Sequence, residues 1–168
     1  MAARDCITLR SMQPQSQALA TLNMNYEISR VSESDKELLA ELRISAMKES
    51  LENIGRFNPE VARNRFLDSF CKNDTKKVLV EGELVGFYVT HNTGDHIHLD
   101  HLYFSPQFQK LGLGSKILTL IKDEAKDIGL PIRLGALRES RSNDFYKKHG
   151  FRYTHEEEWD IYYEFTHG

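Results

Sequence analysis

The segment from residue 96 to residue 137 constrains the fold more than any other part of this 168-residue chain. A β-rich run at 96–104 passes through a proline turn into a glycine-rich loop that contains Gly112 and Gly114. Apolar residues then recur at helical spacing, which predicts a helix that packs on a sheet: Leu113, Ile117, Leu120, Ile121, Ala125 and Ile128. A second β-rich run follows at 132–137. Because a crossover helix separates the two runs, we expect the two strands to be parallel.

The flanking segments predict further strands and helices around this unit. A short strand is expected at 26–31, a capping box at 34–37 opens one helix, and Asn58-Pro59 opens a second. Two β-rich runs that meet at 81–82 are typical of a hairpin. The downstream elements are a short helix at 143–149, a short strand near Arg152 and a last strand at 159–165. This order predicts an α/β fold with a mixed sheet and no internal repeat.

The composition excludes several classes of partner. With 22 Lys and Arg against 25 Asp and Glu, the chain has no excess of positive charge for a polyanion, so we expect no nucleic-acid partner. No run approaches the roughly 18 to 20 apolar residues of a membrane span, which predicts no membrane association and a cytoplasmic location. Cys6 and Cys71 belong to no metal-ligand spacing, so we expect no metal.

Residues 1–23 differ in composition from the rest of the chain. They are polar, rich in Ser, Gln and Ala, and show no clear period. The pattern predicts a disordered extension at 1–23, followed by a single domain at 24–168. A transit peptide is the alternative, but Asp5 and the lack of an amphipathic face argue against it.

The glycine-rich loop has the features of an anion-binding site. The first amides of a helix have no intrahelical partner and carry a partial positive charge, so they can bind a phosphate. Gly112 and Gly114 lack a Cβ, which lets a phosphate approach the main chain. The loop is not a P-loop, because Gly114 is followed by Ser115-Lys116. It is not a dinucleotide fingerprint either, because three predicted strands and two helices precede the strand that leads into it. A plain structural turn is the remaining alternative.

A second motif downstream narrows the choice. The segment Phe145-Tyr146-x-x-x-Gly-Phe follows the predicted strand at 132–137. Together with Gln109-x-x-Gly-x-Gly, it resembles the sequence pattern of the GNAT superfamily of N-acetyltransferases. The resemblance implies a mixed, mostly antiparallel sheet of six to seven strands with about four helices, in which the fourth and fifth strands splay apart. It also implies acetyl-CoA as the cosubstrate.

The resemblance assigns cofactor contacts residue by residue. The pantetheine arm would pair with the backbone of the strand before the loop, the loop amides would hold the pyrophosphate, and Ser115 would add a hydroxyl donor. The implied cofactor-binding residues are Leu102, Tyr103, Phe104, Gln109, Lys110, Leu111, Gly112, Leu113, Gly114, Ser115, Asn143 and Tyr146. Lys110 is either a phosphate ligand or a solvated loop charge. Asn143 either reaches the pantetheine or acts as a helix cap, because the family's commoner position for an Asn is occupied here by Glu139.

The resemblance also implies catalytic residues. An alkylamine with a pKa near ~10 must lose a proton before it attacks a thioester, and the departing thiolate benefits from an acid. Tyr146 matches the family's tyrosine beside the sulfur, and the alternative is a tyrosine that only packs on the sheet. Counting back from Gln109, His98 lies where several GNAT enzymes place a base. The arylalkylamine acetyltransferases are similar, but Asp100 replaces their second histidine, which suggests a His-carboxylate pair.

Strand alternation places His98 and Asp100 on one face and His101 on the other, so His101 and His96 are predicted to be packing or edge residues. A purely structural role is the alternative for His98 and Asp100. We therefore expect an N-acetyltransferase, monomer or homodimer, that transfers the acetyl group of acetyl-CoA directly to a primary amine of a small molecule or peptide. The alternative is a non-catalytic acyl-CoA sensor or a protein-interaction module.

Overall fold

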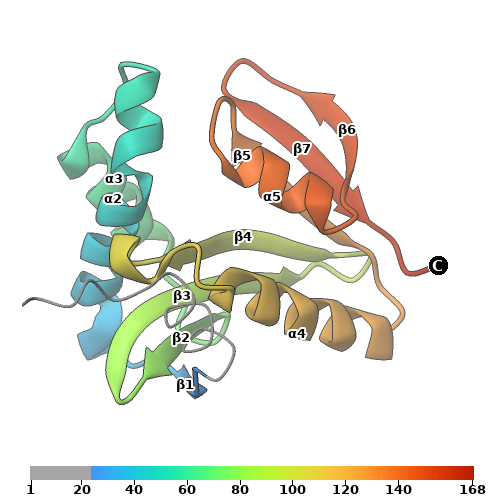
Figure 1. The fold of residues 1–168 in the computed structure, drawn as a ribbon, viewed down its shortest axis with the longest axis horizontal. Coiled ribbons are helices and arrows are strands. Elements are labelled where there is room, and N and C mark those ends of the chain that lie inside the picture. The colour runs from blue at the N-terminus through green and yellow to red at the C-terminus, as the bar shows by residue number, and fades with distance from the viewer. Residues whose placement is uncertain (1–23) are drawn as a thin grey trace, which may run out of the picture.

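A twisted sheet with helices on both faces forms the body of the protein in a computed structural model that describes residues 24–168 (Figure 1). The prediction of a disordered extension at 1–23 lies outside the described residues. Within the described part, the sheet has seven strands in the order β1-β2-β3-β4-β5-β7-β6. The strands are β1 Tyr26–Arg30, β2 Thr75–Val80, β3 Glu83–Asn92, β4 Ile97–Phe104, β5 Ile132–Leu137, β6 Arg152–Glu156 and β7 Asp160–Phe165. Only the β4–β5 pair is parallel, so the predicted mixed, mostly antiparallel sheet is confirmed.

The helices are α2 Lys36–Asn53, α3 Pro59–Ser69, α4 Leu113–Asp127 and α5 Ser142–Lys148, with short 3-10 turns η1 Glu33–Asp35 and η2 Pro106–Phe108. The predicted start of α3 is confirmed, because the Asn58 side chain accepts the amide hydrogen of Val61 at 3.1 Å. The capping box predicted at 34–37 was wrong. The box lies at Ser32, whose amide donates to the Asp35 carboxylate at 2.8 Å, and Lys77 also contacts that carboxylate.

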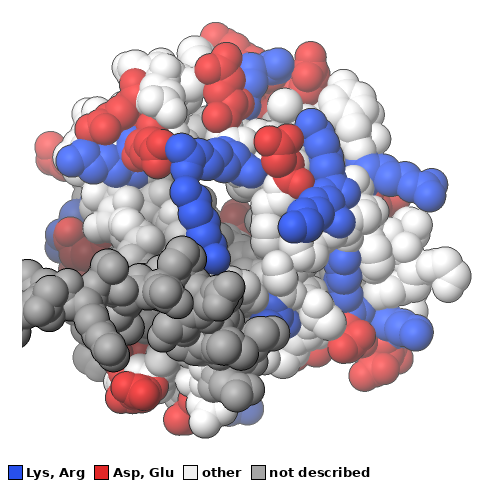
Figure 2. All heavy atoms as spheres, viewed as in Figure 1, with Lys and Arg blue, Asp and Glu red and all other residues white. Residues whose placement is uncertain are grey.

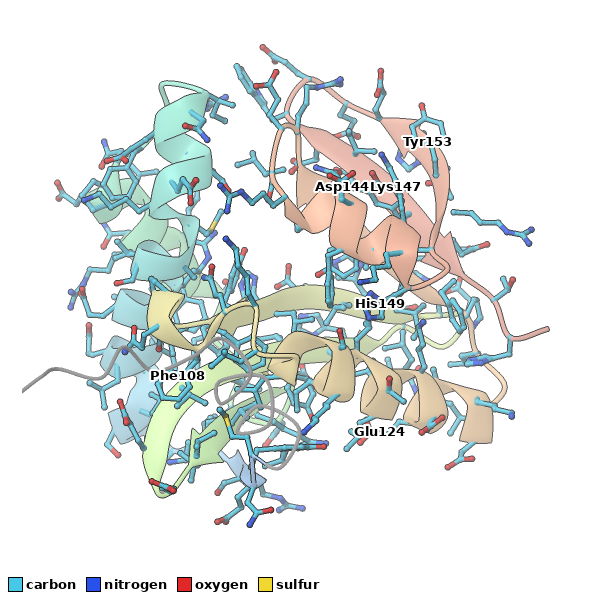
Figure 3. The ribbon with its side chains drawn as sticks, in the orientation of Figure 1. Phe108, Glu124, Asp144, Lys147, His149 and Tyr153 are labelled. Carbon is cyan, nitrogen blue, oxygen red and sulfur yellow. The ribbon has the colours of Figure 1, made fainter. Side chains whose placement is uncertain are left out.

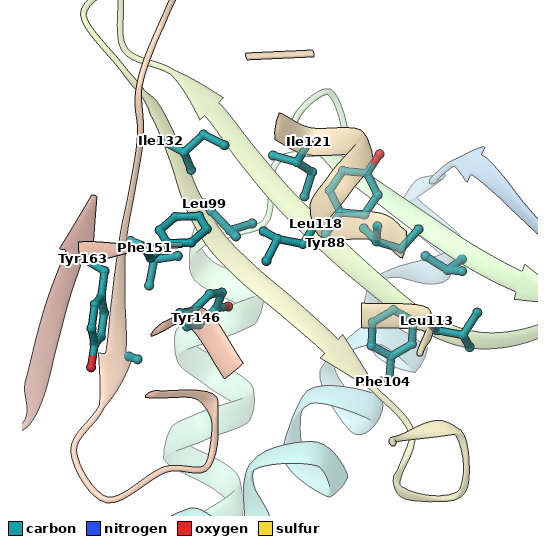
Figure 4. Close-up of a cluster of buried hydrophobic side chains, with 14 of the residues drawn as sticks. Tyr88, Leu99, Phe104, Leu113, Leu118, Ile121, Ile132, Tyr146, Phe151 and Tyr163 are labelled. Carbon is teal, nitrogen blue, oxygen red and sulfur yellow. The ribbon is translucent and has the colours of Figure 1, made fainter. Parts of the chain in front are cut away.

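Two buried clusters hold the layers together. One lies between α4 and the sheet and includes Ile117, Ile121, Tyr88 and Leu99, together with Tyr146 from α5 (Figure 4). The other lies beneath α2 and α3 on the opposite face of the sheet: Val31, Leu39, Ala40, Leu42, Phe66, Phe87 and Val89. Because both faces of the central strands are covered, β3 is a nearly continuous apolar run.

The two halves of the sheet separate beyond the first residues of β4 and β5. These strands pair only at Ile97 with Ile132 and at His98 with Arg133. Beyond these pairs, the group formed by β5, β6, β7 and α5 leans away from β4 in Figure 1. The predicted splay between the fourth and fifth strands is therefore confirmed. It leaves the backbone of β4 from Leu99 to Phe104 without a strand partner on the β5 side, which is where an extended ligand can pair.

Candidate active site

The loop between β4 and α4 keeps its amide hydrogens free. Gln109 Nε2 donates to the carbonyl of Phe104 at 2.9 Å, which ties the loop to the end of β4. Gly112 precedes the first turn of α4 with φ 82°, a left-handed conformation that favours glycine. Among residues 24–168, the amides of 110–115 have no hydrogen-bond partner. A row of free amides at the positive end of a helix is a site for an anion.

Lys110 in the loop and Ser115 in the first turn of α4 differ in whether their side chains already have a hydrogen-bond partner. Lys110 is exposed and also adopts a positive φ, 61°. Ser115, in contrast, is already engaged, because its Oγ lies 2.9 Å from His149 Nε2. Sequence reasoning treated His149 only as the end of a helix and missed this contact, since the two residues are 34 positions apart and lie on different helices.

Asn143 has a structural position in α5. Its Nδ2 donates to the carbonyls of Leu137 and Ser140, both at 2.9 Å, and its Oδ1 accepts the hydroxyl hydrogen of Tyr163 at 2.9 Å. Both amide hydrogens are therefore used within the protein. The side chain ties the end of β5 and the start of α5 to β7, and it does not have a hydrogen left for a ligand. Arg141, rather than Asn143, is the N-cap of α5.

Tyr146 is buried, but its hydroxyl is not fully enclosed by the protein. The residue is 8% exposed, and its ring packs against Phe151 and Tyr163 (Figure 4) and against Phe145. Its hydroxyl has no hydrogen-bond partner among the described residues, yet it is not among the enclosed unpaired atoms, unlike the Tyr88 hydroxyl. Burial raises the pKa of the Tyr146 phenol, and Tyr103 on β4 raises it further. The phenol therefore stays protonated and able to donate across the physiological range.

A β-bulge in β4 changes the predicted faces of the strand. Thr90 pairs with Leu99 and Val89 pairs with His101, so Asp100 is an extra residue without a partner on β3. The alternation predicted for His101 was wrong for this reason. Leu99 packs in the α4 cluster, whereas the His101 ring lies 5.7 Å from that of Phe66 and 6.1 Å from that of Phe87 on the opposite face.

The bulge surrounds Asp100 with histidines. Its carboxylate oxygens lie 3.9 Å from His98 Nε2, 3.6 Å from His101 Nε2 and 3.7 Å from His91 Nε2. Burial lowers the pKa of His98, although the charge of Asp100 opposes this shift. Burial lowers the pKa of His101 to about 4, again against the charge of Asp100. Both imidazoles are thus neutral at pH 7, and half-exposed His98 has a lone pair available for a proton.

His91 is the residue of this cluster that sequence reasoning missed. Its Nδ1 lies 2.8 Å from the Asp74 carboxylate, and its ring stacks on His98 with centroids 6.3 Å apart. The missed signal was the register of the β3–β4 hairpin, in which His91 is directly opposite His98. No group of three or more His, Cys, Asp or Glu side chains within residues 24–168 is arranged to hold a metal ion.

Tyr103 on β4 lies next to the histidine cluster, with its ring 5.5 Å from that of His101. Burial raises the pKa of Tyr103, while Arg43 on α2 lowers it and Asp100 raises it. The Arg43 guanidinium lies 6.0 Å from the centre of the Tyr103 ring. The charge of Asp100 thus raises the pKa of Tyr103, and Tyr103 in turn raises that of Tyr146. None of the described helices is long and apolar enough to cross a membrane.

Comparisons with solved structures show where this fold recurs. The structure resembles the PaiA N-acetyltransferase from Thermoplasma acidophilum in complex with coenzyme A, with a TM-score of 0.73, 21% identity, and coverage of 86% of this chain and 100% of the other. It also resembles an acetyltransferase from Thermus thermophilus (TM-score 0.66, 16% identity, 84% and 96% covered). A third is the ribosomal-protein-S18-alanine N-acetyltransferase from Escherichia coli (TM-score 0.65, 16% identity, 86% and 96% covered).

Sequence comparison identifies the family. A search of curated proteins finds no match. The model of the acetyltransferase (GNAT) domain, however, matches residues 34–166, which include the amide-lined loop, the bulged strand and Tyr146. The chain therefore belongs to the GNAT family of acetyltransferases.

Proposed function

We propose that the protein transfers the acetyl group of acetyl-CoA directly to a primary amine of a small molecule or peptide. The observation that carries this proposal is the Tyr146 hydroxyl on α5, which has no hydrogen-bond partner among the described residues and is not fully enclosed. The free amides of 110–115 and the unpaired edge of β4 support it, since together they suit a diphosphate joined to an extended arm.

Each part of CoA has a candidate binding segment. The backbone of Leu102, Tyr103 and Phe104 would pair with the pantetheine arm, because β5 leaves this edge free. The amides that follow Gln109 would hold the diphosphate, with Leu111, Leu113 and Gly114 contributing through the main chain. Lys110 is placed to add a charge at the solvent side of the loop. Asn143 supports the site by holding β5, α5 and β7 together rather than by contacting the cofactor.

The proposed chemistry is a transfer in a ternary complex. His98, kept neutral by burial and oriented beside Asp100, removes a proton from the acceptor ammonium through water. The amine nitrogen then forms a bond to the thioester carbonyl carbon, and the bond from carbon to sulfur breaks. Tyr146, whose raised pKa keeps its phenol protonated, donates that proton to the departing thiolate. The nitrogen loses its second proton as the amide forms, and this proton returns through water to the Tyr146 phenolate, while His98 releases the first proton to solvent.

Charges near the splay suit a cationic acceptor. Asp160 at the start of β7 has a raised pKa because of burial and the nearby Glu157. Its negative charge in turn contributes to the raised pKa of Tyr103. Asp100 approaches Tyr103 from β4. On the other side, Arg56 stacks on Trp159 with 3.9 Å between the guanidinium and the ring centre, which connects the α2–α3 loop to the β6–β7 loop. Basic and acidic side chains are intermingled over the face in Figure 2.

An acetyl-CoA-dependent thiol-release screen against amines, amino acids and peptides tests the proposal. We expect CoA at about one hundred times its Kd to add about 2.7 kcal/mol to the stability of the protein. That corresponds to a rise in Tm of roughly 5 to 10 °C for a domain of this size. At least one amine should release thiol. A rise in Tm without thiol release from any amine would favour an acyl-CoA sensor. The absence of both effects would contradict the proposal that this protein binds acetyl-CoA.

A pair of glycine variants tests the amide-lined loop. Gly112→Ala and Gly129→Ala each place a Cβ at a positive φ, 82° and 70°, at opposite ends of α4, with no atom within 4 Å of either Cβ. We expect both to lower the free energy of unfolding by about 1 to 2 kcal/mol. Only Gly112→Ala should weaken CoA, by roughly ten-fold, or about 1.4 kcal/mol, because it disturbs the amides of the loop. Equal CoA affinities in calorimetry would show that the loop does not hold the diphosphate.

A further inference from the structure

The hydrogen bonds of His149 determine which way the Ser115 hydroxyl points. His149 Nδ1 lies 2.7 Å from the carbonyl oxygen of Phe145, and Nε2 lies 2.9 Å from Ser115 Oγ. A carbonyl oxygen only accepts, so Nδ1 carries the hydrogen. A neutral imidazole has one hydrogen, so Nε2 is a bare acceptor. The Ser115 hydroxyl hydrogen is therefore donated to His149 and is turned away from any ligand.

This arrangement is fixed by its surroundings. Ser115 lies in the first turn of α4, directly after the free amides of the loop. Figure 3 shows His149 on the side of α5 that faces α4. Its ring is half-buried and lies 4.3 Å from the ring of Phe145. The imidazole thus holds the two helices together across the region where the diphosphate is proposed to bind.

We propose that His149 takes up a proton from solvent when CoA binds, and that this proton releases the Ser115 hydroxyl for the diphosphate. The inference rests on the proposed function, since it requires CoA at the loop. The imidazolium keeps its bond from Nδ1 to Phe145 and gains a hydrogen on Nε2, which it donates to Ser115 Oγ. Ser115 then accepts from His149 and donates its own hydrogen to a phosphate oxygen. Only this one proton is gained, and no covalent bond to carbon or phosphorus changes.

The charges around His149 explain why proton uptake depends on the ligand. Lys122 on α4 donates to the His149 carbonyl, and Lys147 and Lys148 are exposed at the end of α5, whereas the Lys116 ammonium lies 5.8 Å from the centre of the Tyr26 ring. A bound diphosphate would add negative charge beside the imidazole. Because charge-assisted hydrogen bonds are stronger than neutral ones, this ligand favours the imidazolium.

The experiment is isothermal titration with dephospho-CoA, which lacks the 3′-phosphate monoester that itself titrates near pH 6. At pH 7.5, in buffers of different ionisation enthalpy, we expect an uptake of roughly half to one proton per molecule bound, because an imidazole changes charge in this range. The affinity should rise by up to about ten-fold for each unit of pH lowered between 8 and 6.

His149→Gln should bind without proton uptake and with an affinity that does not depend on pH, and Ser115→Ala should lose most of both effects. His155→Gln, on β6, is the control, because its ring stacks on Tyr162 in an exposed position and the variant should keep the wild-type uptake. The Tm of each variant verifies folding. Proton uptake equal in wild type and His149→Gln, or tight wild-type binding without uptake, would overturn the inference.

Two further outcomes separate the inference from the function on which it rests. CoA itself should show the same difference in proton uptake between wild type and His149→Gln, since the titration of its 3′-phosphate is common to both proteins. Failure of folded wild-type protein to bind either CoA or dephospho-CoA at any pH would instead overturn the proposed function, and the inference with it.

Discussion

Tyr146→Phe is expected to lower kcat for acetyl transfer by about 10²- to 10³-fold, within the range for loss of a positioned acid. CoA affinity and Tm should stay close to the wild-type values. The hydroxyl has no hydrogen-bond partner among the described residues, so its removal breaks no bond within the protein. The ring, which packs against Phe145, Phe151 and Tyr163, is retained. Steady-state kinetics with acetyl-CoA and an acceptor from the screen measure the effect.

Tyr163→Phe is the matched control for this variant. Tyr163 belongs to the same buried cluster, but its hydroxyl donates to Asn143 Oδ1. Its loss should lower the free energy of unfolding by about 1 kcal/mol and leave kcat within a few-fold of wild type. The opposite results, with stability lost in Tyr146→Phe and activity lost in Tyr163→Phe, would show that Tyr146 is not the acid.

His98→Ala is expected to lower kcat/KM at pH 7 by roughly 10²-fold, because a general base of this kind contributes 10² or more. In the wild type, burial lowers the pKa of His98, so its basic form persists below pH 6.5 and the acidic limb of the profile should lie below that value. Activity is lost as pH falls through the lowered pKa, since protonated imidazole cannot accept a proton. In the variant, the rate should instead rise with pH toward the pKa of the amine itself, near ~10.

His96→Gln and Asp100→Asn complete this test. His96 lies beside His98, with 6.2 Å between the ring centres, and its Nδ1 is bound to Asp95 at 2.7 Å and to Thr93 at 2.9 Å in the turn before β4. Its charge contributes to the lowered pKa of His98, so His96→Gln should keep the rate at pH 7 and move the acidic limb only slightly, to higher pH. Asp100→Asn removes the charge that opposes the lowered pKa of His98 and should move the acidic limb to still lower pH. A wild-type profile in His98→Ala would exclude His98 as the base and leave Asp100 as the candidate.

The elements with strong local signals were predictable. The apolar spacing after Leu113 corresponds to α4, and Asn58 with Pro59 begins α3 as expected. Glu81 and Gly82, both with positive φ, form the turn of the predicted hairpin. Each of these features depends on neighbours within a few residues, so short-range pattern is sufficient to recognise it.

The face of His101 was not predictable from alternation. A bulge inserts one residue into the register between β3 and β4, and nothing in the sequence of β4 alone marks Asp100 as that residue. The same applies to Asn143, whose amide is used by carbonyls before it and by Tyr163, twenty residues away on β7. Such contacts depend on how separate elements pack, which sequence spacing does not record.

The sequence by itself therefore determined the strand-loop-helix-strand unit and the row of amides after Gln109, because backbone conformation at a glycine-rich helix start is a local property. Only the tertiary structure decided which groups surround those amides and the bulge. Packing of α5 on α4 brings His149 to Ser115, and the β3–β4 register brings His91 to Asp100. These pairs determine which hydroxyl and imidazole hydrogens are already used in hydrogen bonds within the protein. They form only because segments distant in the sequence pack in one core.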